Sequence, residues 1–198
     1  MKASTLLHGS IAALCLFGQA AQADADRRSD TEEITALMHC YARGTDAIGD
    51  ATTNSNPRAA GLAIYEKCFT RDAEFRAWFP QQPFDSQTFP DPAGATPFIG
   101  PANWATFVDG VFRSNGYDFT QHMISNVDVS VSGRRGTLTA YLNATHVVSG
   151  TEVGGESQCV QVANGTYSLN VRKIGSQWKI TKLDLTLITF NRVFGCGT

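Results

Sequence analysis

The sequence predicts an α+β fold in a single domain, and two observations support that prediction. Hydrophobic residues recur at helical spacing in the first half of the chain, and they alternate with polar residues from about Thr120 onward. The 198 residues are 42% hydrophobic and 17% charged, which is typical of one globular domain. Because helices come first and strands follow, we expect N-terminal helices packed on one face of a curved, mainly antiparallel sheet.

The first helix should begin at a cap on Asp30 or Thr31 and end near Thr45, since apolar residues lie on one side of that segment. Two further helices and one strand follow before Thr120. They are expected over residues 59–69 (helix), 73–79 (strand) and 102–113 (helix).

Two long loops separate these elements. One covers residues 49–60, and the other covers residues 80–101, which hold six of the seven prolines. Loops of this length are uncommon without a role, so we expect them to cover or narrow a pocket.

Strands occupy the rest of the chain. Val127, Val129 and Val131 alternate with polar residues, and turns are expected near Gly133 and Gly175. Further strands are predicted over residues 137–149, 157–173 and 178–190, which gives a four-stranded antiparallel meander.

Residues 1–23 resemble an export signal. Lys2 is followed by an apolar run over residues 11–17 and by the small-residue cleavage pattern Ala21-Gln22-Ala23. The apolar run is shorter than the roughly 20 residues that span a bilayer. We therefore expect a secreted or periplasmic domain over residues 24–198, with no membrane association once the signal is removed.

Export leaves four cysteines, Cys40, Cys68, Cys159 and Cys196, in an oxidising compartment. They allow three pairings, of which we favour Cys40 with Cys68 and Cys159 with Cys196. No two of them have the short spacing of a zinc site, so no metal is expected. Sixteen basic against eighteen acidic residues give a net charge of −2, which disfavours nucleic acid as a partner.

Two titratable residues stand out by position. Asp46 lies just past the first helix, where the helix dipole disfavours a negative charge. His122 opens a strand and shares its side with Ile124 and Asn126. From the residues alone, a solvated carboxylate and a structural histidine remain open alternatives to a catalytic pair.

Several segments, in this order, resemble the SnoaL-like domain of the nuclear transport factor 2-like superfamily: ITALMHCYARGTD, YEKCFTRDAEF, FIGPANWATFVDGVF, TQHMISNVDVSV, AYLNATHVV and YSLNVRKIGSQWKITKLDL. The resemblance covers about residues 30–190 and is nearest to the branch with scytalone dehydratase, hexachlorocyclohexane dehydrochlorinase and bile-acid dehydratase. It implies a cone-like α+β barrel around an apolar pocket, commonly assembled as a homodimer or homotrimer.

The resemblance also implies a chemistry. Asp46 and His122 match the branch's catalytic pair, in which the carboxylate orients an imidazole that acts as general base. Such an enzyme is a cofactor-independent lyase or isomerase for a small, largely apolar cyclic substrate. Residues expected to line the substrate pocket are Tyr41, Trp104, Asn126 and Tyr141, and a third polar partner is expected at Asn143, His146 or Thr166.

Two functions without catalysis are the alternatives. In one, the same pocket holds a small hydrophobic ligand and the polar pair only orients it. In the other, side chains fill the pocket and the domain is a scaffold that dimerises through its open sheet face.

Overall fold

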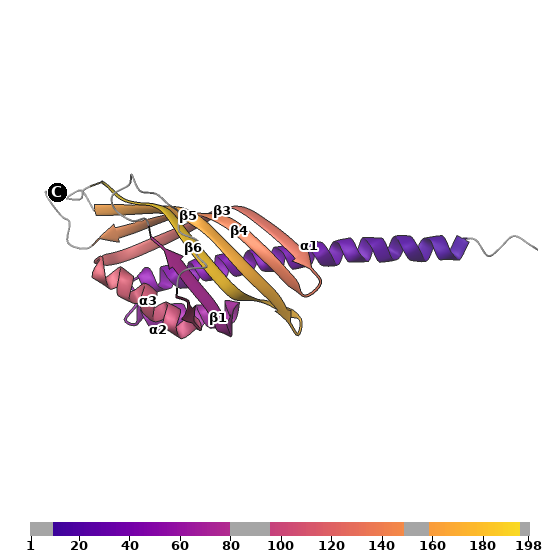
Figure 1. Ribbon diagram of the computed structural model, residues 1–198, viewed down its shortest axis with the longest axis horizontal. Coiled ribbons are helices and arrows are strands. Elements are labelled where there is room, and N and C mark those ends of the chain that lie inside the picture. The colour runs from indigo at the N-terminus through magenta and orange to yellow at the C-terminus, as the bar shows by residue number, and fades with distance from the viewer. Residues whose placement is uncertain (1–9, 80–95, 149–158, 195–198) are drawn as a thin grey trace, which may run out of the picture.

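A computed structural model describes residues 10–79, 96–148 and 159–194, with side chains over 29–79, 96–148 and 159–190. Figure 1 shows its helices and strands. In chain order they are α1 (Ser10–Gly49), α2 (Pro57–Cys68), β1 (Phe69–Trp78), β2 (Phe98–Ile99), α3 (Pro101–Ser114), β3 (Tyr117–Ser132), β4 (Arg135–Val148), β5 (Cys159–Ile174) and β6 (Gln177–Phe194).

The strands form one six-stranded sheet in the order β2-β1-β6-β5-β4-β3. The predicted antiparallel meander is confirmed as β3 to β6. The sheet is larger than predicted because β1 pairs in parallel with β6, and β2 pairs antiparallel with β1. No hairpin joins β1 to β6, so their connection does not impose an antiparallel direction.

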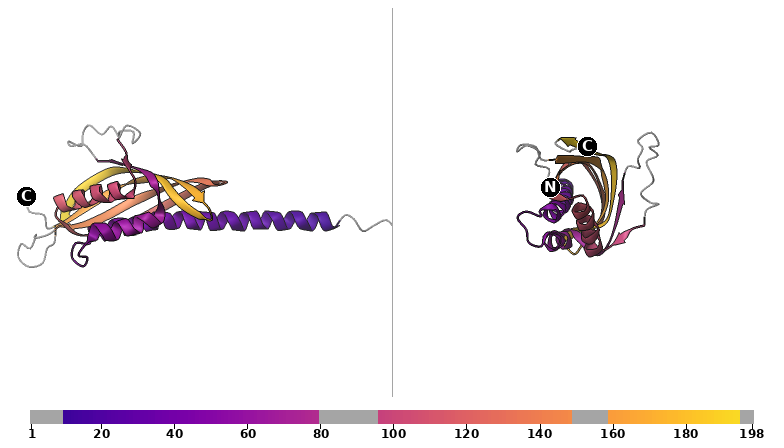
Figure 2. Two further views of the ribbon diagram at one scale, coloured as in Figure 1. Left: turned by 90° about the horizontal axis from the view of Figure 1, so that it is seen from below. Right: turned by 90° about the vertical axis from the view of Figure 1, so that its left-hand side faces the viewer.

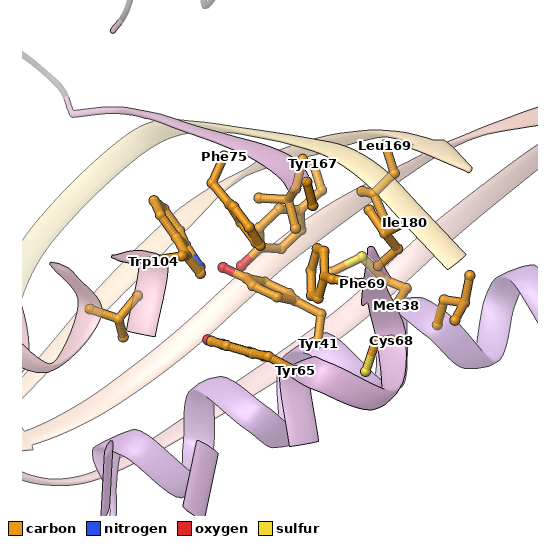
Figure 3. Packing of buried hydrophobic residues seen from close by; sticks show 14 of the residues in the cluster. Met38, Tyr41, Tyr65, Cys68, Phe69, Phe75, Trp104, Tyr167, Leu169 and Ile180 are labelled. Atoms are coloured by element: carbon orange, nitrogen blue, oxygen red, sulfur yellow. The ribbon is translucent and has the colours of Figure 1, made fainter. Parts of the chain in front are cut away.

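All three helices lie on the concave side of this sheet, which curves around them in the end-on view (Figure 2). The predicted α+β class, with N-terminal helices packed on a curved, mainly antiparallel sheet, is therefore confirmed. The core lies between the helices and the inner sheet face. Figure 3 shows the aromatic side chains that fill part of it.

Helix α1 is longer than predicted at both ends (Figure 1). It runs through the expected cap, because no glycine or proline interrupts the sequence from 19 to 43. Asp30 instead accepts hydrogen bonds from Lys173 Nζ at 2.6 Å and Trp178 Nε1 at 2.8 Å, which hold the helix against the β5–β6 hairpin. Residues 10–23 of the predicted export signal belong to α1, and residues 1–9 lie outside the described part.

Helices α1 and α2 are joined covalently by the predicted Cys40–Cys68 disulfide. They also pack closely, since a Cβ added at Gly61 would lie 2.5 Å from the Gly44 carbonyl oxygen. Cys159 is disulfide-bonded as well. Its predicted partner, Cys196, lies outside the described residues.

The predicted loops are shorter than expected where the structure describes them. Residues 49–60 contain the end of α1 and the start of α2, where Asn56 accepts a capping hydrogen bond from the Ala59 N–H. Residues 80–95 lie outside the described part, but residues 98–101 form β2 and begin α3. Within the described segments, no helix combines the length and the hydropathy needed to cross a bilayer.

Candidate active site

A carboxylate and an imidazole meet where the end of α1 contacts β3. Asp46 Oδ1 lies 2.7 Å from His122 Nδ1, and the Thr120 hydroxyl donates to the same oxygen at 3.3 Å. The backbone N–H of His122 donates to both carboxylate oxygens, at 3.0 and 3.2 Å. Because a carboxylate only accepts, Nδ1 of His122 is the nitrogen that donates to Asp46, and in the neutral imidazole Nε2 is then the acceptor.

Asp46 lies in the last turn of α1, not past the helix end as the sequence predicted. The helix dipole disfavours a negative charge at this end. Three donors from β3 offset that penalty: the Thr120 hydroxyl and the ring and backbone N–H groups of His122. The imidazole is the buried partner, because the His122 side chain is 7% exposed and that of Asp46 30%.

Close packing at Gly49 brings α1 and β3 together. A Cβ added at Gly49 would lie 2.0 Å from Thr120 Oγ1, so only glycine allows β3 to approach α1 this closely. The glycine therefore helps to set the distance between the carboxylate and the imidazole, although it touches neither.

His122 forms part of the wall of a cavity of about 60 Å³ between the helices and the inner sheet face. Most of the wall is apolar, and it includes Phe79, which directly follows β1 and is 39% exposed. The polar or amphipathic side chains in the wall are Tyr41, Thr45, Trp104, Tyr117, His122, His146 and Tyr167.

A second histidine lies beside His122. The ring centroids of His146 and His122 are 5.6 Å apart, and His146 stacks on Tyr117 at 4.6 Å. Burial first, and the nearby His122 second, lower the pKa of His146 to about 4. His146 is therefore neutral near pH 7. Its Nδ1 lies 3.4 Å from the Gln161 carbonyl oxygen, and Gln161 Oε1 accepts from the Tyr117 hydroxyl.

Tyrosines gather elsewhere in the same core (Figure 3). The hydroxyls of Thr45 and Tyr65 are hydrogen-bonded at 2.7 Å. Tyr41 stacks on Tyr65 and meets Tyr167 edge-on, with centroids 5.6 and 5.4 Å apart. Burial raises the pKa of Tyr41 to about 12 and holds those of Tyr65 and Tyr167 well above their usual value. These hydroxyls therefore stay protonated at any physiological pH.

Of the six predicted site residues, four lie together at this cavity. Asp46 and His122 form the pair, and Tyr41 and Trp104 line the wall. Among the three candidates for a third partner, only His146 lines the cavity. Asn143 and Thr166 lie on the outer sheet face, where Asn143 donates to Asn164 at 2.8 Å.

Asn126 and Tyr141 are not brought to the cavity, contrary to expectation. The register of β3 shifts between Ser125 and Asp128, and Asn126 within this bulge has φ 49° and is exposed. The bulge ends the inward set formed by Thr120, His122 and Ile124. Tyr141 is 56% exposed because alternate residues of β4, such as Leu142, face inward instead.

Sequence reasoning missed Tyr117 and Tyr167. Tyr167 has the same parity as buried Leu169 and Val171 in β5, which could have identified it as an inward residue. Tyr117 begins β3 immediately after a glycine, and no pattern in the sequence distinguishes it. Among the described residues, no cluster of three His, Cys, Asp or Glu side chains could hold a metal ion.

The family model of the SnoaL-like domain matches residues 26–184. No curated protein matches the chain in sequence.

Solved structures similar in fold include a hexachlorocyclohexane dehydrochlorinase from Novosphingobium barchaimii LL02, with 16% identity and a TM-score of 0.60 over 86% of this chain and 94% of that one. A candidate scytalone dehydratase from Novosphingobium aromaticivorans has 16% identity and a TM-score of 0.57 over 84% and 89%. An NTF2-like protein with a cystatin-like fold from the latter organism has 20% identity and a TM-score of 0.53 over 85% and 88%. These structural similarities show a shared fold, and they confirm the predicted cone-like architecture.

Proposed function

Because this chain belongs to the SnoaL-like domain family, we propose that it is a cofactor-independent lyase or isomerase that removes a proton from a small cyclic substrate. One observation supports this proposal most directly: His122, which Asp46 contacts at 2.7 Å, lines an otherwise largely apolar cavity. Two structural relatives carry names of elimination enzymes, a dehydrochlorinase and a candidate dehydratase, which agrees with this chemistry.

The proposed step starts at His122 Nε2. Its lone pair takes a proton from a ring carbon, and the electron pair of that C–H bond forms the new double bond. The leaving group departs with its own bonding electrons. When it leaves as hydroxide, the proton held on His122 passes to it and water is released, which restores the free base. Asp46 holds the imidazole in the reactive tautomer throughout.

We assign the third polar position to His146. It is neutral, so it does not add a second positive charge when His122 takes up the proton. The Gln161 carbonyl oxygen faces its Nδ1, which favours a hydrogen there and leaves Nε2 as an acceptor. His146 is therefore suited to accept a hydrogen bond from a substrate hydroxyl.

The cavity limits the size of the substrate. Its volume of about 60 Å³ is far below the roughly 300–1,000 Å³ of pockets for drug-sized ligands. A substrate no larger than a single small ring is therefore expected, and side chains of the wall must move to admit it, since a cavity of about 150 Å³ is one that holds benzene.

An elimination assay on small rings tests the proposal. Cyclic β-hydroxy ketones and chlorinated cyclohexanes are incubated with the protein, and the double bond formed is followed by absorbance and mass spectrometry. Asp46→Asn and His122→Gln should each lower the rate by about 10²–10⁴-fold. The matched controls are Asp109→Asn and His39→Gln, which change the same residue types on α3 and on the exposed side of α1.

Equal rates in the wild type and both site variants would refute the catalytic role. If the wild type turns over none of these compounds, and the variants bind a ring as tightly as the wild type does, the chain is instead a binding protein.

We also propose that residues 1–23 direct export and that the mature chain begins at Asp24. The Cys40–Cys68 disulfide agrees with an oxidising compartment. Expression of the full chain with its native N-terminus in a bacterial host tests this proposal. Periplasmic or secreted protein that starts at Asp24 by mass spectrometry is the expected result, and intact cytoplasmic protein would contradict it.

Assembly into a homodimer or homotrimer is part of the same proposal. Met123 and Tyr141 are 50% and 56% exposed on the outer sheet face, where a second copy could cover them. Light scattering should give a dimer or trimer mass, and Tyr141→Glu should shift it toward the monomer. A monomeric wild type would contradict this assignment.

A further inference from the structure

We propose that a polar groove on the outer face of the sheet, which Asp72, Arg135 and Arg172 line, binds a hydroxylated carboxylate such as a sugar acid. The groove shares no residue with the cavity that His122 lines on the inner face. It also lies about 20 Å along β4 from Tyr141, where a second copy is proposed to pack. It is therefore a second site, independent of the proposed elimination chemistry.

The polar groove has room for a small molecule. Its volume is about 640 Å³, within the range of roughly 300–1,000 Å³ of ligand pockets. It lies near the turns that join β3 to β4 and β5 to β6, which Figure 1 shows at one end of the sheet. The side chains that offer hydroxyl or amide groups to it are Thr70, Ser130, Ser132, Thr137, Asn170 and Thr181. A wall of this kind favours a ligand with hydroxyl groups over an apolar ring.

An irregular stretch of β1 forms one side of the groove. The register of β1 against β6 shifts between Phe69 and Glu74, so this stretch does not follow a regular ladder. The Ala73 carbonyl oxygen within it accepts a hydrogen bond from the Gly100 N–H at 2.8 Å, which holds the backbone in place. Asp72, from the same stretch, lines the groove and gives this side a carboxylate.

Two arginines are the feature that points to an anion. Arg135 of β4 and Arg172 of β5 lie directly opposite each other in the ladder, and both are exposed. Like charges at directly opposite positions destabilise a sheet. Within the part of the chain that the structure describes, neither guanidinium forms an ion pair or donates a hydrogen bond. An anion bound between the two guanidiniums therefore relieves their repulsion.

Two other charged side chains of the groove are neutralised by neighbours on their own strands. Glu74 contacts Arg76 at 3.3 Å, and Lys182 contacts Asp184 at 2.6 Å. The two pairs lie side by side, because Glu74 is the strand neighbour of Lys182. Neither pair has a net charge, so neither determines the charge of the ligand.

Asp72 compensates one of the two arginines. The nearby Thr70 hydroxyl, and to a smaller extent the Arg172 guanidinium, lower the pKa of Asp72, which keeps it ionised at neutral pH. One carboxylate against two guanidiniums leaves one positive charge, which matches a monoanion better than a dianion. Guanidinium groups bind carboxylate oxygens in pairs. A sugar acid has this single carboxylate together with the hydroxyl groups that the polar wall favours.

Titration calorimetry at low salt tests the groove with probes that separate charge from hydroxyl groups. Glucuronate should bind the wild type about tenfold more tightly than glucose, which lacks the carboxylate, and than acetate, which lacks the hydroxyl groups. Arg135→Gln and Arg172→Gln should each weaken glucuronate binding by about tenfold. Arg58→Gln is the matched control, because Arg58 is an exposed arginine on α2 outside the groove.

Asp72→Asn should change affinity in the opposite direction. It leaves both guanidiniums uncompensated, so glucuronate should bind more tightly, and the dianion glucose 6-phosphate should gain more affinity than glucuronate does. Asp72 is exposed, so the variant is expected to fold, and thermal unfolding checks this. Unchanged or weaker binding of both probes to the folded variant would contradict the charge balance in the groove.

Three results would each overturn the site. These are equal affinities for glucuronate and glucose, equal affinities for glucuronate and acetate, and glucuronate binding that survives both arginine variants. The elimination rate should stay the same in the arginine variants, because they lie outside the cavity that His122 lines. Loss of elimination in Asp46→Asn without any binding of glucuronate would leave the proposed function standing and refute the groove alone.

Discussion

Two polar sets share one cavity, and they differ in whether their hydrogen bonds are made. Around His122, Asp46 accepts from three donors, and Tyr117 donates to Gln161. Around Trp104, the indole N–H and the Tyr167 hydroxyl have no partner within the described part of the chain. The first set is fixed by its hydrogen bonds, whereas the second is fixed mainly by the packing of its rings on Phe75 and Tyr41.

The two sets are also held in place differently. The His122 set depends on close contact between α1 and β3 at Gly49. The tyrosine set, which is Tyr41 with its neighbours Tyr65 and Tyr167, is held partly by the packing of α1 on α2, which the Cys40–Cys68 disulfide joins covalently. A change can therefore weaken one set and spare the other.

Removing the disulfide should affect the tyrosine set most. The chain-entropy estimate for a loop closed by cysteines 28 positions apart is about 3–4 kcal/mol of stabilisation. The double variant Cys40→Ala/Cys68→Ala should lose this amount of unfolding free energy in urea, and the stack of Tyr41 on Tyr65 should loosen before the Asp46–His122 geometry is lost. A loss of less than about 1 kcal/mol would show that helix packing alone holds the set.

His146 should make stability depend on pH on the His122 side. Its pKa is lowered in the folded state from 6.5 to about 4, so the unfolded chain binds the extra proton first as pH falls. The contribution of His146 to the free energy of unfolding is therefore constant above about pH 6.5. It falls by about 3 kcal/mol in total as the pH drops to about 4.

Urea unfolding of the wild type and His146→Phe between pH 7 and 4 measures this difference. The variant should show a shallower dependence in that window. Parallel curves for the two proteins would contradict the assignment.

Gly49→Ala should disturb the His122 set and spare the tyrosine set. The new Cβ would press on Thr120, whose hydroxyl bonds Asp46, at a cost of about 1–3 kcal/mol. The rate of elimination should fall while the near-ultraviolet circular dichroism of the buried tyrosines stays near that of the wild type.

Gly110→Ala is the matched control for this change. A Cβ at that position of α3 meets nothing within 4 Å, so the substitution should be neutral or stabilise by about 0.5–1 kcal/mol. If both variants lost activity equally, the close contact at Gly49 would not explain the effect.

The smallest effects separate a satisfied hydroxyl from an unsatisfied one. Tyr117→Phe leaves the buried Gln161 oxygen without its donor and should cost about 1–3 kcal/mol. Tyr167→Phe removes a hydroxyl that has no partner and should be neutral or slightly stabilising. Thermal unfolding of the two variants, in the absence of any ring compound, makes the comparison, and equal losses would erase the distinction between the two sets.

Local pattern predicted most of the fold. The meander, the order of helices before strands and the Cys40–Cys68 pair follow from periodicity and cysteine usage. The parallel pairing of β1 with β6 does not, because it joins segments about a hundred residues apart with no turn between them. The start of α1 was misplaced because Asp30 resembles a cap but forms a bridge to Lys173.

The site was predictable where residues carried a family pattern and not where the backbone departed from regularity. Asp46 and His122 were located by resemblance, and the structure places them in contact. Asn126 was misplaced because its parity was counted through a bulge. The sequence does hold a signal for that bulge: His122 and Ile124 share one parity while Val127 and Val129 share the other, and all four cannot face inward on a regular strand.

The contact between Asp46 and His122 joins positions 76 residues apart, which has a consequence for how the domain folds. Helical segments such as α1 form within microseconds, whereas long-range contacts wait for loop closure and strand pairing. The carboxylate is therefore present on its helix well before its histidine arrives on β3. During refolding, the far-ultraviolet helix signal should recover ahead of elimination activity, so that activity reports the completion of folding.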